Sequence, residues 1–296
     1  MTPAASGLVI VDKPSGWTSH DVVAQIRRLA GTRRVGHAGT LDPMATGVLV
    51  VGVEKATRLL GHLTLAEKAY TGTMRLGQAT STDDAEGEIV SAAGAGHLTT
   101  GEIRAAAAAL TGEIRQVPPQ VSAVKVAGER AYRVARSGRV APLRARDVTV
   151  RVFDVAAIRR ATAAAAPVID ADVSVTCSSG TYIRSLARDL GAALGVGGHL
   201  VALRRIRSGR YDIAGARTLD QLAASFTVLP LADAAAAEFP RREVTGQEAE
   251  RVAHGGTLPA AGIGPGPVAV YGPDGGFLAL IEEEGGVARP LAVFVP

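Results

Sequence analysis

An aspartate in a constrained loop is the first residue of this sequence that is suited to chemistry. Asp42 lies in GHAGTLDPMATG, residues 36–47, directly before the apolar run VLVVGV. Pro43 restricts the preceding residue to extended backbone, and the glycines of the loop let the chain approach a ligand closely. The carboxylate is therefore well placed as a nucleophile, general base or ligand. The alternative is a turn in which Asp42 bonds its own backbone.

An arginine at the start of a predicted helix is the second candidate. The segment TYIRSLARDLGAALG, residues 181–195, predicts a helix, and Arg184 falls in its first turn. Because the helix dipole disfavours a cation there by about 0.3–1 kcal/mol, the position calls for a substrate phosphate or a carboxylate. The alternative is a solvated surface arginine. The neighbouring Tyr182 fits either the core or a ring that stacks on a base.

Several further positions stay ambiguous when they are considered one at a time. His37 shares the loop of Asp42, which suggests acid–base chemistry, and no metal site is expected because no second ligand stands at suitable spacing. The acids of TDDAEG, Asp83 and Asp84 among them, suit the second carboxylate of glycosidase-like chemistry or a solvated turn. Tyr70 begins a predicted strand and carries no signal by itself. The sequence has no phosphate-binding loop and no dinucleotide fingerprint.

Charge and cysteine content narrow the class of protein. Residues 1–238 carry 28 Lys and Arg against 21 Asp and Glu, whereas residues 239–296 carry 4 against 7. An anionic partner, nucleic acid or phosphorylated, fits the basic part. The single cysteine, Cys177, excludes an intramolecular disulfide and a multi-cysteine metal site. No apolar run reaches the length of a membrane span, so we expect a soluble, cytoplasmic protein.

The elements that must position these residues indicate an α+β protein with a mixed or antiparallel sheet, because several predicted strand pairs lack an intervening helix. Residues 116–147 form a basic, partly irregular excursion, and residues from about 240 to 296 predict a small β module with a hairpin at Pro-Asp-Gly-Gly. Predicted helices cover 18–31, 99–114 and 181–195, and predicted strands cover 48–53, 68–77, 148–158 and 168–180.

Four segments carry a family pattern in this order and spacing: GHAGTLDPMATGVLVV, KAYTGTMRLGQATSTDDAEGEIV, VPPQVSAVKVAGERAYRVARSGR and CSSGTYIRSLARDLG. From about Gly7 to its end the chain closely resembles the bacterial TruB family, which makes pseudouridine at position 55 in the T loop of tRNA. The resemblance implies a pseudouridine synthase fold, with a mixed, largely antiparallel sheet, flanking helices and a central catalytic cleft. It implies a catalytic domain over 1–238, with a thumb-like basic excursion at about 120–147, and a PUA-like RNA-binding module over 239–296.

The same resemblance implies three catalytic residues. Asp42 matches the family's nucleophile, and Arg184 matches the arginine that pairs with it and keeps it ionised. Tyr70 matches the tyrosine that stacks on the target base and is a candidate base for deprotonating the sugar. The uridine is extruded from its loop, and the aspartate attacks either the ribose C1′ or the uracil C6. The resemblance requires no cofactor and no metal.

Five residues are implied to bind the substrate. Tyr182 matches a pocket tyrosine, Asp84 a polar pocket residue, and His37 a loop histidine that fills the space left by flipped-out bases. Lys13 and Lys125 are expected to meet phosphates. The expected partner is the T stem-loop of tRNA, with no obligate protein partner, and we expect a monomer.

Two other classes of function stay open. One is a tRNA-folding chaperone, in which flipping and refolding are the main work and chemistry is secondary. The other is a hydrolase of N-glycosides that uses Asp42 with Asp84 and releases free uracil.

Overall fold

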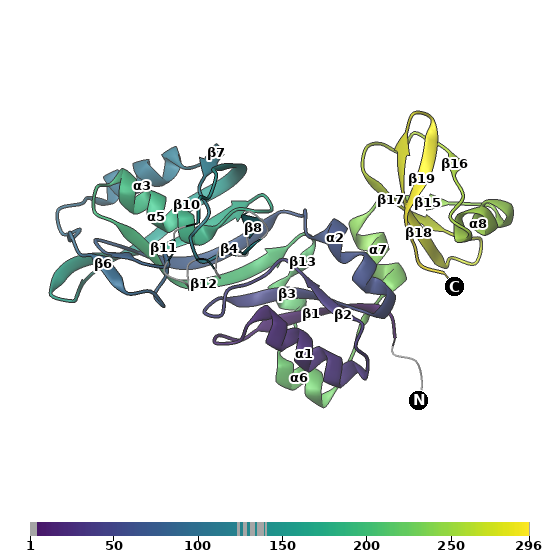
Figure 1. Cartoon of the computed structure of the whole chain (residues 1–296), viewed down its shortest axis with the longest axis horizontal. Coiled ribbons are helices and arrows are strands. Elements are labelled where there is room, and N and C mark those ends of the chain that lie inside the picture. The colour runs from purple at the N-terminus through teal and green to yellow at the C-terminus, as the bar shows by residue number, and fades with distance from the viewer. Residues whose placement is uncertain are drawn as a thin grey trace. The chain divides into compact units, whose positions relative to one another are not determined.

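The computed structural model describes residues 5–122, 125–126, 129–130, 134, 139 and 141–295 (Figure 1). They form two compact units. The first joins Met1–Pro43, Gly47–Ala66 and Ser208–Pro296, and the second joins Met44–Thr46 and Glu67–Arg207. Strand pairing is largely antiparallel in both, which confirms the predicted α+β class. The proposed division at residue 238 into a catalytic domain and a β module does not coincide with these units.

Antiparallel strands of a ten-stranded sheet organise the start of the first unit. β1 (Gly7–Lys13) pairs with β3 (Thr46–Val53), and β2 (Val35–Ala38) pairs with β3 as well. β14 (Leu229–Pro230) extends the other side of β1. The predicted loop over 36–47 is therefore too long at both ends. The glycine-rich start of that segment becomes a strand because of its partner β3, since its composition alone does not favour one.

Helices cover both faces of this sheet. α1 (Ser19–Ala30) and α6 (Leu219–Ala224) enclose the core that contains Val9, Val11 and Ile26. The opposite face carries Leu8 and Val50 and packs with α2 (Leu60–Leu63) and α7 (Leu231–Glu238). Successive side chains of β1 therefore point into opposite cores, as they must in a strand whose two faces are both covered.

The first helix follows its sequence signals closely. Thr18 caps α1, because its hydroxyl accepts the Asp21 N–H at 3.1 Å while the Asp21 carboxylate accepts the Thr18 N–H at 2.9 Å. Gly31 ends the helix in the left-handed conformation, with φ of 65°. Both ends are predicted from the sequence, because caps are local.

The predicted β module is a five-stranded sheet in the order β15-β17-β18-β19-β16, with α8 (Gly246–Ala253) beside it. The predicted hairpin is confirmed as β17 and β18. Tyr271 and Phe277 of this hairpin belong to the core that also contains Leu8, so the module packs on the rest of its unit. The strands are β15 (Arg241–Glu243), β16 (Leu258–Pro259), β17 (Pro267–Tyr271), β18 (Phe277–Glu284) and β19 (Val287–Val293).

The second unit is built on strands in the order β12-β4-β11-β10-β7. α3 (Thr100–Ala109) and α5 (Ile183–Ala193) lie on the same side of these strands (Figure 1), and α3 packs against both β10 and α5. The predicted helix over 99–114 is too long, because Gly112 takes a φ of 100° and its successors pair with β10. The strands are β4 (Lys68–Leu76), β7 (Gly112–Gln116), β10 (Arg146–Ala163), β11 (Ala166–Cys177) and β12 (Gly198–Ser208).

Short elements complete the described part of the chain. They are β5 (Ala79–Thr80), β6 (Ile89–Ser91), β8 (Lys125–Val126), β9 (Glu129–Arg130), β13 (Tyr211–Asp212) and the 3-10 turns η1 (Glu54–Arg58) and η2 (Ile213–Gly215). Within the described residues, no helix has the length and apolar character needed to cross a bilayer.

The contact between α5 and the start of β12 depends on two glycines. A Cβ placed on Gly191 would stand 2.2 Å from the backbone N of Gly198, whereas a Cβ on Gly61 in α2 would meet nothing within 4 Å. We expect Gly191→Ala to destabilise the protein by roughly 1–3 kcal/mol through overpacking, although alanine is the better helix former. Gly61→Ala should be neutral or stabilising. Thermal unfolding followed by circular dichroism measures both, and equal midpoints would contradict this packing role.

Candidate active site

Asp42 lies half-buried in the loop between β2 and β3, and both of its neighbours are tied down by side chains from other segments. The Ser19 hydroxyl accepts the Leu41 N–H at 2.9 Å and donates to the Leu41 carbonyl at 3.1 Å. The Lys13 Nζ donates to the Pro43 carbonyl at 3.1 Å. The backbone is thus held on each side of Asp42, which limits the positions that its carboxylate can take.

Lys13 is a correction to the sequence-based expectation. Its side chain is fully buried, and Nζ donates to the carbonyls of Pro14, Trp17 and Pro43 at 2.9, 2.5 and 3.1 Å. The prediction that it meets phosphates has no support in this arrangement, because its ammonium is buried and directed at backbone carbonyls. These carbonyls offset the cost of burying its charge, and Lys13 ties the end of β1 to the Asp42 loop.

His37 belongs to β2, where it stands opposite Val51. It is half-buried, and its ring lies edge-on to that of His20, with centroids 5.6 Å apart. The suggested part of His37 in an RNA loop stays a prediction.

The anion that Arg184 requires is the carboxylate of Asp84. Arg184 is 4 % exposed, and its Nη1 lies 3.2 Å from the Asp84 Oδ2. Nη1 also donates to the Thr82 carbonyl at 3.0 Å, and Nη2 donates to the Val121 carbonyl at 2.9 Å. The alternative of a solvated surface arginine is therefore wrong. The pairing of Arg184 with Asp42 stays a prediction, since the two residues belong to different units.

Asp84 is not part of a solvated turn, and this corrects the second expectation for TDDAEG. It is 3 % exposed, and its Oδ1 accepts the Thr82 hydroxyl at 2.5 Å and the Glu86 N–H at 3.1 Å. These bonds orient the carboxylate toward Arg184. Asp84 thus holds the guanidinium of Arg184 in place. The predicted contact of Asp84 with substrate has no support in this arrangement.

The adjacent Asp83 has a different environment. Its carboxylate binds Arg188 at 3.0 Å, and its backbone is left-handed, with φ of 61°. Burial raises the pKa of Asp83 above its usual value, and the positive charges of Arg188 and Arg184 offset only part of this effect.

Two tyrosines stand near α5 and on the central strands of the second unit. Tyr70 is 7 % exposed on β4, opposite Val175 of β11. Tyr182 is the residue directly before α5, and its N–H and carbonyl both bind the side chain of Gln116, at 2.8 and 3.1 Å. The roles of both rings toward a base stay predictions.

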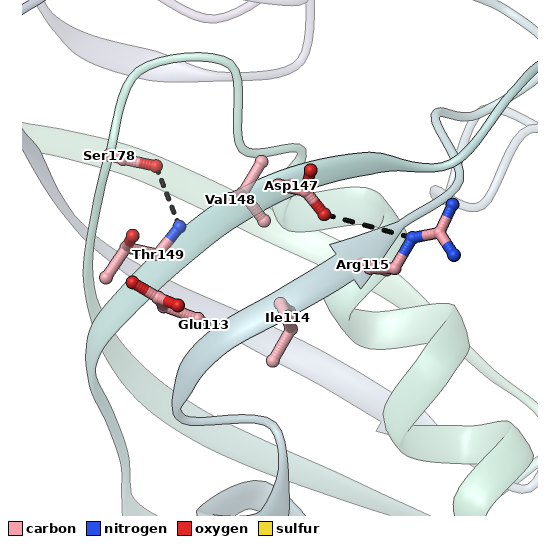
Figure 2. Close-up of a pocket in the computed structure, with 7 residues that line it drawn as sticks. All are labelled: Glu113, Ile114, Arg115, Asp147, Val148, Thr149 and Ser178. Atoms are coloured by element: carbon pink, nitrogen blue, oxygen red, sulfur yellow. Dashed lines mark hydrogen bonds and ion pairs between the residues drawn. The ribbon is translucent and has the colours of Figure 1, made fainter.

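The loop that leads into α5 is fastened to β10. The Thr149 N–H donates to the Ser178 Oγ at 2.9 Å, and the Ser178 N–H donates to the Thr149 carbonyl at 2.8 Å. Figure 2 shows these residues in a shallow pocket beside β7 and β10, where Arg115 and Asp147 form an exposed pair at 3.8 Å. Such a pair contributes little to stability. The pocket contains none of the predicted site residues.

Ser19 and Gln116 are supports of the site that the sequence does not reveal. Ser19 has the pattern of a helix cap only, and Gln116 carries no signal, because a glutamine that binds distant backbone has no local pattern. Lys125 lies in β8, but its side chain is outside the described part of the chain, and so are residues 123–124, 127–128, 131–133, 135–138 and 140 of the basic excursion at 120–147. Their contact with phosphates stays a prediction.

Family models cover most of the chain. Residues 27–183 match the TruB family pseudouridylate synthase N-terminal domain, residues 184–235 match the tRNA pseudouridylate synthase B C-terminal domain, and residues 239–295 match the C-terminal model of tRNA pseudouridine synthase II. The fold and these matches define the class of protein as a pseudouridylate synthase, which is an isomerase.

Relatives and solved structures agree with this class. The chain is 62 % identical to tRNA pseudouridine synthase B of Thermobifida fusca, over 98 % of this chain and 99 % of the relative, and 60 % identical to that of Streptomyces griseus, over 99 % and 98 %. It is also similar to a chain in a crystal structure of a Cbf5-Nop10-Gar1 complex, with 29 % identity, a TM-score of 0.75, and coverage of 99 % of this chain and 86 % of that one. The chain belongs to the TruB family.

Removing the charge of Asp84 should lower the stability of the protein, whereas removing the charge of the neighbouring Asp83 should raise it. Asp84→Asn removes the charge that faces a buried arginine, and we expect a loss of up to about 3–5 kcal/mol of unfolding free energy. Asp83→Asn is the matched control: asparagine tolerates the left-handed backbone, and the raised pKa of Asp83 means that its charged form opposes folding at pH 7. Thermal unfolding of both variants at pH 7 tests this. Similar losses in the two would contradict it.

The stability of Asp83→Asn relative to the unchanged protein should change with pH in a direction that the pKa of Asp83 fixes. Because the pKa of Asp83 is higher in the folded state than in the unfolded state, its contribution favours folding at low pH and is lost as pH rises. The midpoint of Asp83→Asn relative to the unchanged protein should therefore rise between pH 4 and pH 7. A difference that falls over this range would show that Asp83 is stabilising when charged.

Proposed function

We propose that this chain converts uridine 55 in the T loop of tRNA to pseudouridine, with Asp42 as the nucleophile. Membership of the TruB family and the names of its relatives support the reaction and the substrate. The observation that carries the assignment of Asp42 is the double tether of its loop, by Ser19 at Leu41 and by Lys13 at Pro43. A nucleophile aimed at a single carbon gains rate from such restriction.

The target base must first leave its loop. A uridine stacked within folded RNA is inaccessible, and extruding it costs a few kcal/mol. In our proposal the flipped uracil stacks on Tyr70 and enters a pocket with Tyr182, while His37 occupies the space left in the RNA. Phosphate contacts come from the basic excursion, Lys125 included. The protein acts as a monomer in the cytoplasm, without an obligate protein partner.

The reaction is an isomerisation, so the atomic composition of the uridine is unchanged. Asp42 attacks either the ribose C1′ or the uracil C6, and both routes remain open. The bond between C1′ and N1 breaks, the base turns within the pocket, and C5 bonds to C1′. The bond that Asp42 made to C1′ or C6 also breaks, which restores the free carboxylate. The proton on C5 is then lost and N1 gains one. Arg184 pairs with Asp42 and keeps it ionised, while the carboxylate of Asp84 holds the guanidinium through Nη1.

The hydrolase alternative is disfavoured by the state of Asp84. A second catalytic carboxylate in a glycosidase must exchange protons with water or the leaving group. Asp84 is 3 % exposed and is bound to Arg184, Thr82 and the Glu86 N–H. The chaperone alternative concerns a different step, and both activities are compatible in one protein.

Release of label from the uracil tests the proposal. With an unmodified tRNA transcript tritiated at uridine C5, the protein should release tritium into water, and Asp42→Asn should abolish the release. Asp220→Asn, an exposed aspartate on α6, is the control that should keep full activity. A T-loop substitution at the target uridine should also stop release. Free uracil as the product would indicate a hydrolase, and tRNA folding that survives Asp42→Asn would show a separate chaperone activity.

The acidic β module should contribute little to phosphate binding. Residues 239–296 hold only four arginines against seven acids, and removing one phosphate-binding side chain lowers the salt slope of tRNA affinity by about one. We expect the double variant Arg251→Gln/Arg289→Gln to keep the slope, and Arg144→Gln/Arg146→Gln, at the end of the excursion, to lower it by about two. All four side chains are exposed. A shallower slope for the first pair alone would overturn this assignment.

A further inference from the structure

The side chain of Gln116 makes two hydrogen bonds with the backbone of Tyr182, the residue directly before α5. It is the last residue of β7 and is 1 % exposed. Its Oε1 accepts the Tyr182 N–H at 2.8 Å, and its Nε2 donates to the Tyr182 carbonyl at 3.1 Å. Because the backbone N–H can only donate, the oxygen of the carboxamide must face it, which fixes the orientation of the amide.

The start of α5 depends on this contact. Tyr182 is the N-cap residue, and its side chain makes no capping hydrogen bond. Its carbonyl accepts the Leu186 N–H at 3.1 Å, which is the first bond of the helix, and also the Gln116 Nε2. Arg184 has its own anchors in Asp84 and two carbonyls. The backbone of Tyr182 is bound by the side chain of Gln116. Arg184 and Tyr182 are therefore held by different sets of hydrogen bonds.

We propose that Gln116 is a positioning residue for the isomerisation: by binding both polar groups of the Tyr182 backbone, it sets where the Tyr182 ring stands. This proposal rests on the proposed function. It does not place Gln116 in contact with the substrate, since the side chain is buried against the chain itself. The consequence of losing it is a misplaced ring in a folded protein.

Gln116→Met keeps the volume of the side chain and removes both hydrogen bonds. A displacement of about 1 Å in an active site can cost a factor of about 100, so we expect the single-turnover rate of tritium release at saturating enzyme to fall about tenfold to 100-fold. The affinity for tRNA should stay within about twofold, because the buried, uncharged side chain of Gln116 offers no contact to a phosphate itself. A rate within about twofold of the unchanged protein would overturn the proposal.

Gln78→Met is the matched control. Gln78 is also 1 % exposed in the second unit, and its Nε2 donates to the Ala163 carbonyl at 2.9 Å. The variant should lose stability in the same way but keep its rate. Equal losses of rate in both variants would show that Gln116 acts only through general stability, and would overturn its positioning role.

Gln116→Glu gives a second measurement if the Met variant does not fold. A carboxylate of the same shape accepts the Tyr182 N–H but cannot donate to its carbonyl, whereas the protonated acid does both. The rate of this variant relative to the unchanged protein should rise as the pH is lowered from 8 to 5.5, with constant tRNA affinity. A flat ratio would overturn the proposal. If the unchanged protein releases no tritium at all, the proposed function is what fails.

Discussion

The buried ion pair of Arg184 and Asp84 is the interaction on which the second unit's site is built. A guanidinium in the first turn of a helix opposes the helix dipole, and its burial adds a desolvation cost. The carboxylate of Asp84 and the carbonyls of Thr82 and Val121 offset both. Since these partners come from segments far apart in sequence, one side chain joins α5 to the turn after β5 and to the start of the excursion. Its position is consequently well determined.

Asp42 and Tyr182 are held by a different means, in which polar side chains bind the neighbouring backbone. Ser19 and Lys13 bind the residues on either side of Asp42, and Gln116 binds both polar groups of the Tyr182 backbone. These hydrogen bonds act on the backbone and so restrict the chain that carries Asp42 and Tyr182. They also explain why Lys13 is buried, since its charge binds the carbonyls that hold the Asp42 loop.

Sequence predicts those features whose causes are local. The Thr18–Asp21 cap and the Gly31 terminus of α1 follow from neighbouring residues, and the β17–β18 hairpin follows from its turn. β2 is missed because its strand geometry comes from pairing with β3. The burial of Lys13 and Asp84 is missed because charged side chains are usually exposed, and the groups that make their burial tolerable stand elsewhere in the chain. The roles of Asp42, Tyr70 and Arg184 come from family resemblance, which no local pattern replaces.

The most direct test of this pair's central role is a double-mutant cycle on the unfolding free energy with Asp84→Asn, Arg184→Gln and the double variant. If this ion pair holds α5 in place, the interaction energy from the cycle should exceed about 1.5 kcal/mol. Each single change leaves the other partner buried without its opposite charge. Effects that add to within about 0.5 kcal/mol would mean that Arg184 is held by its backbone partners alone, and would contradict that role.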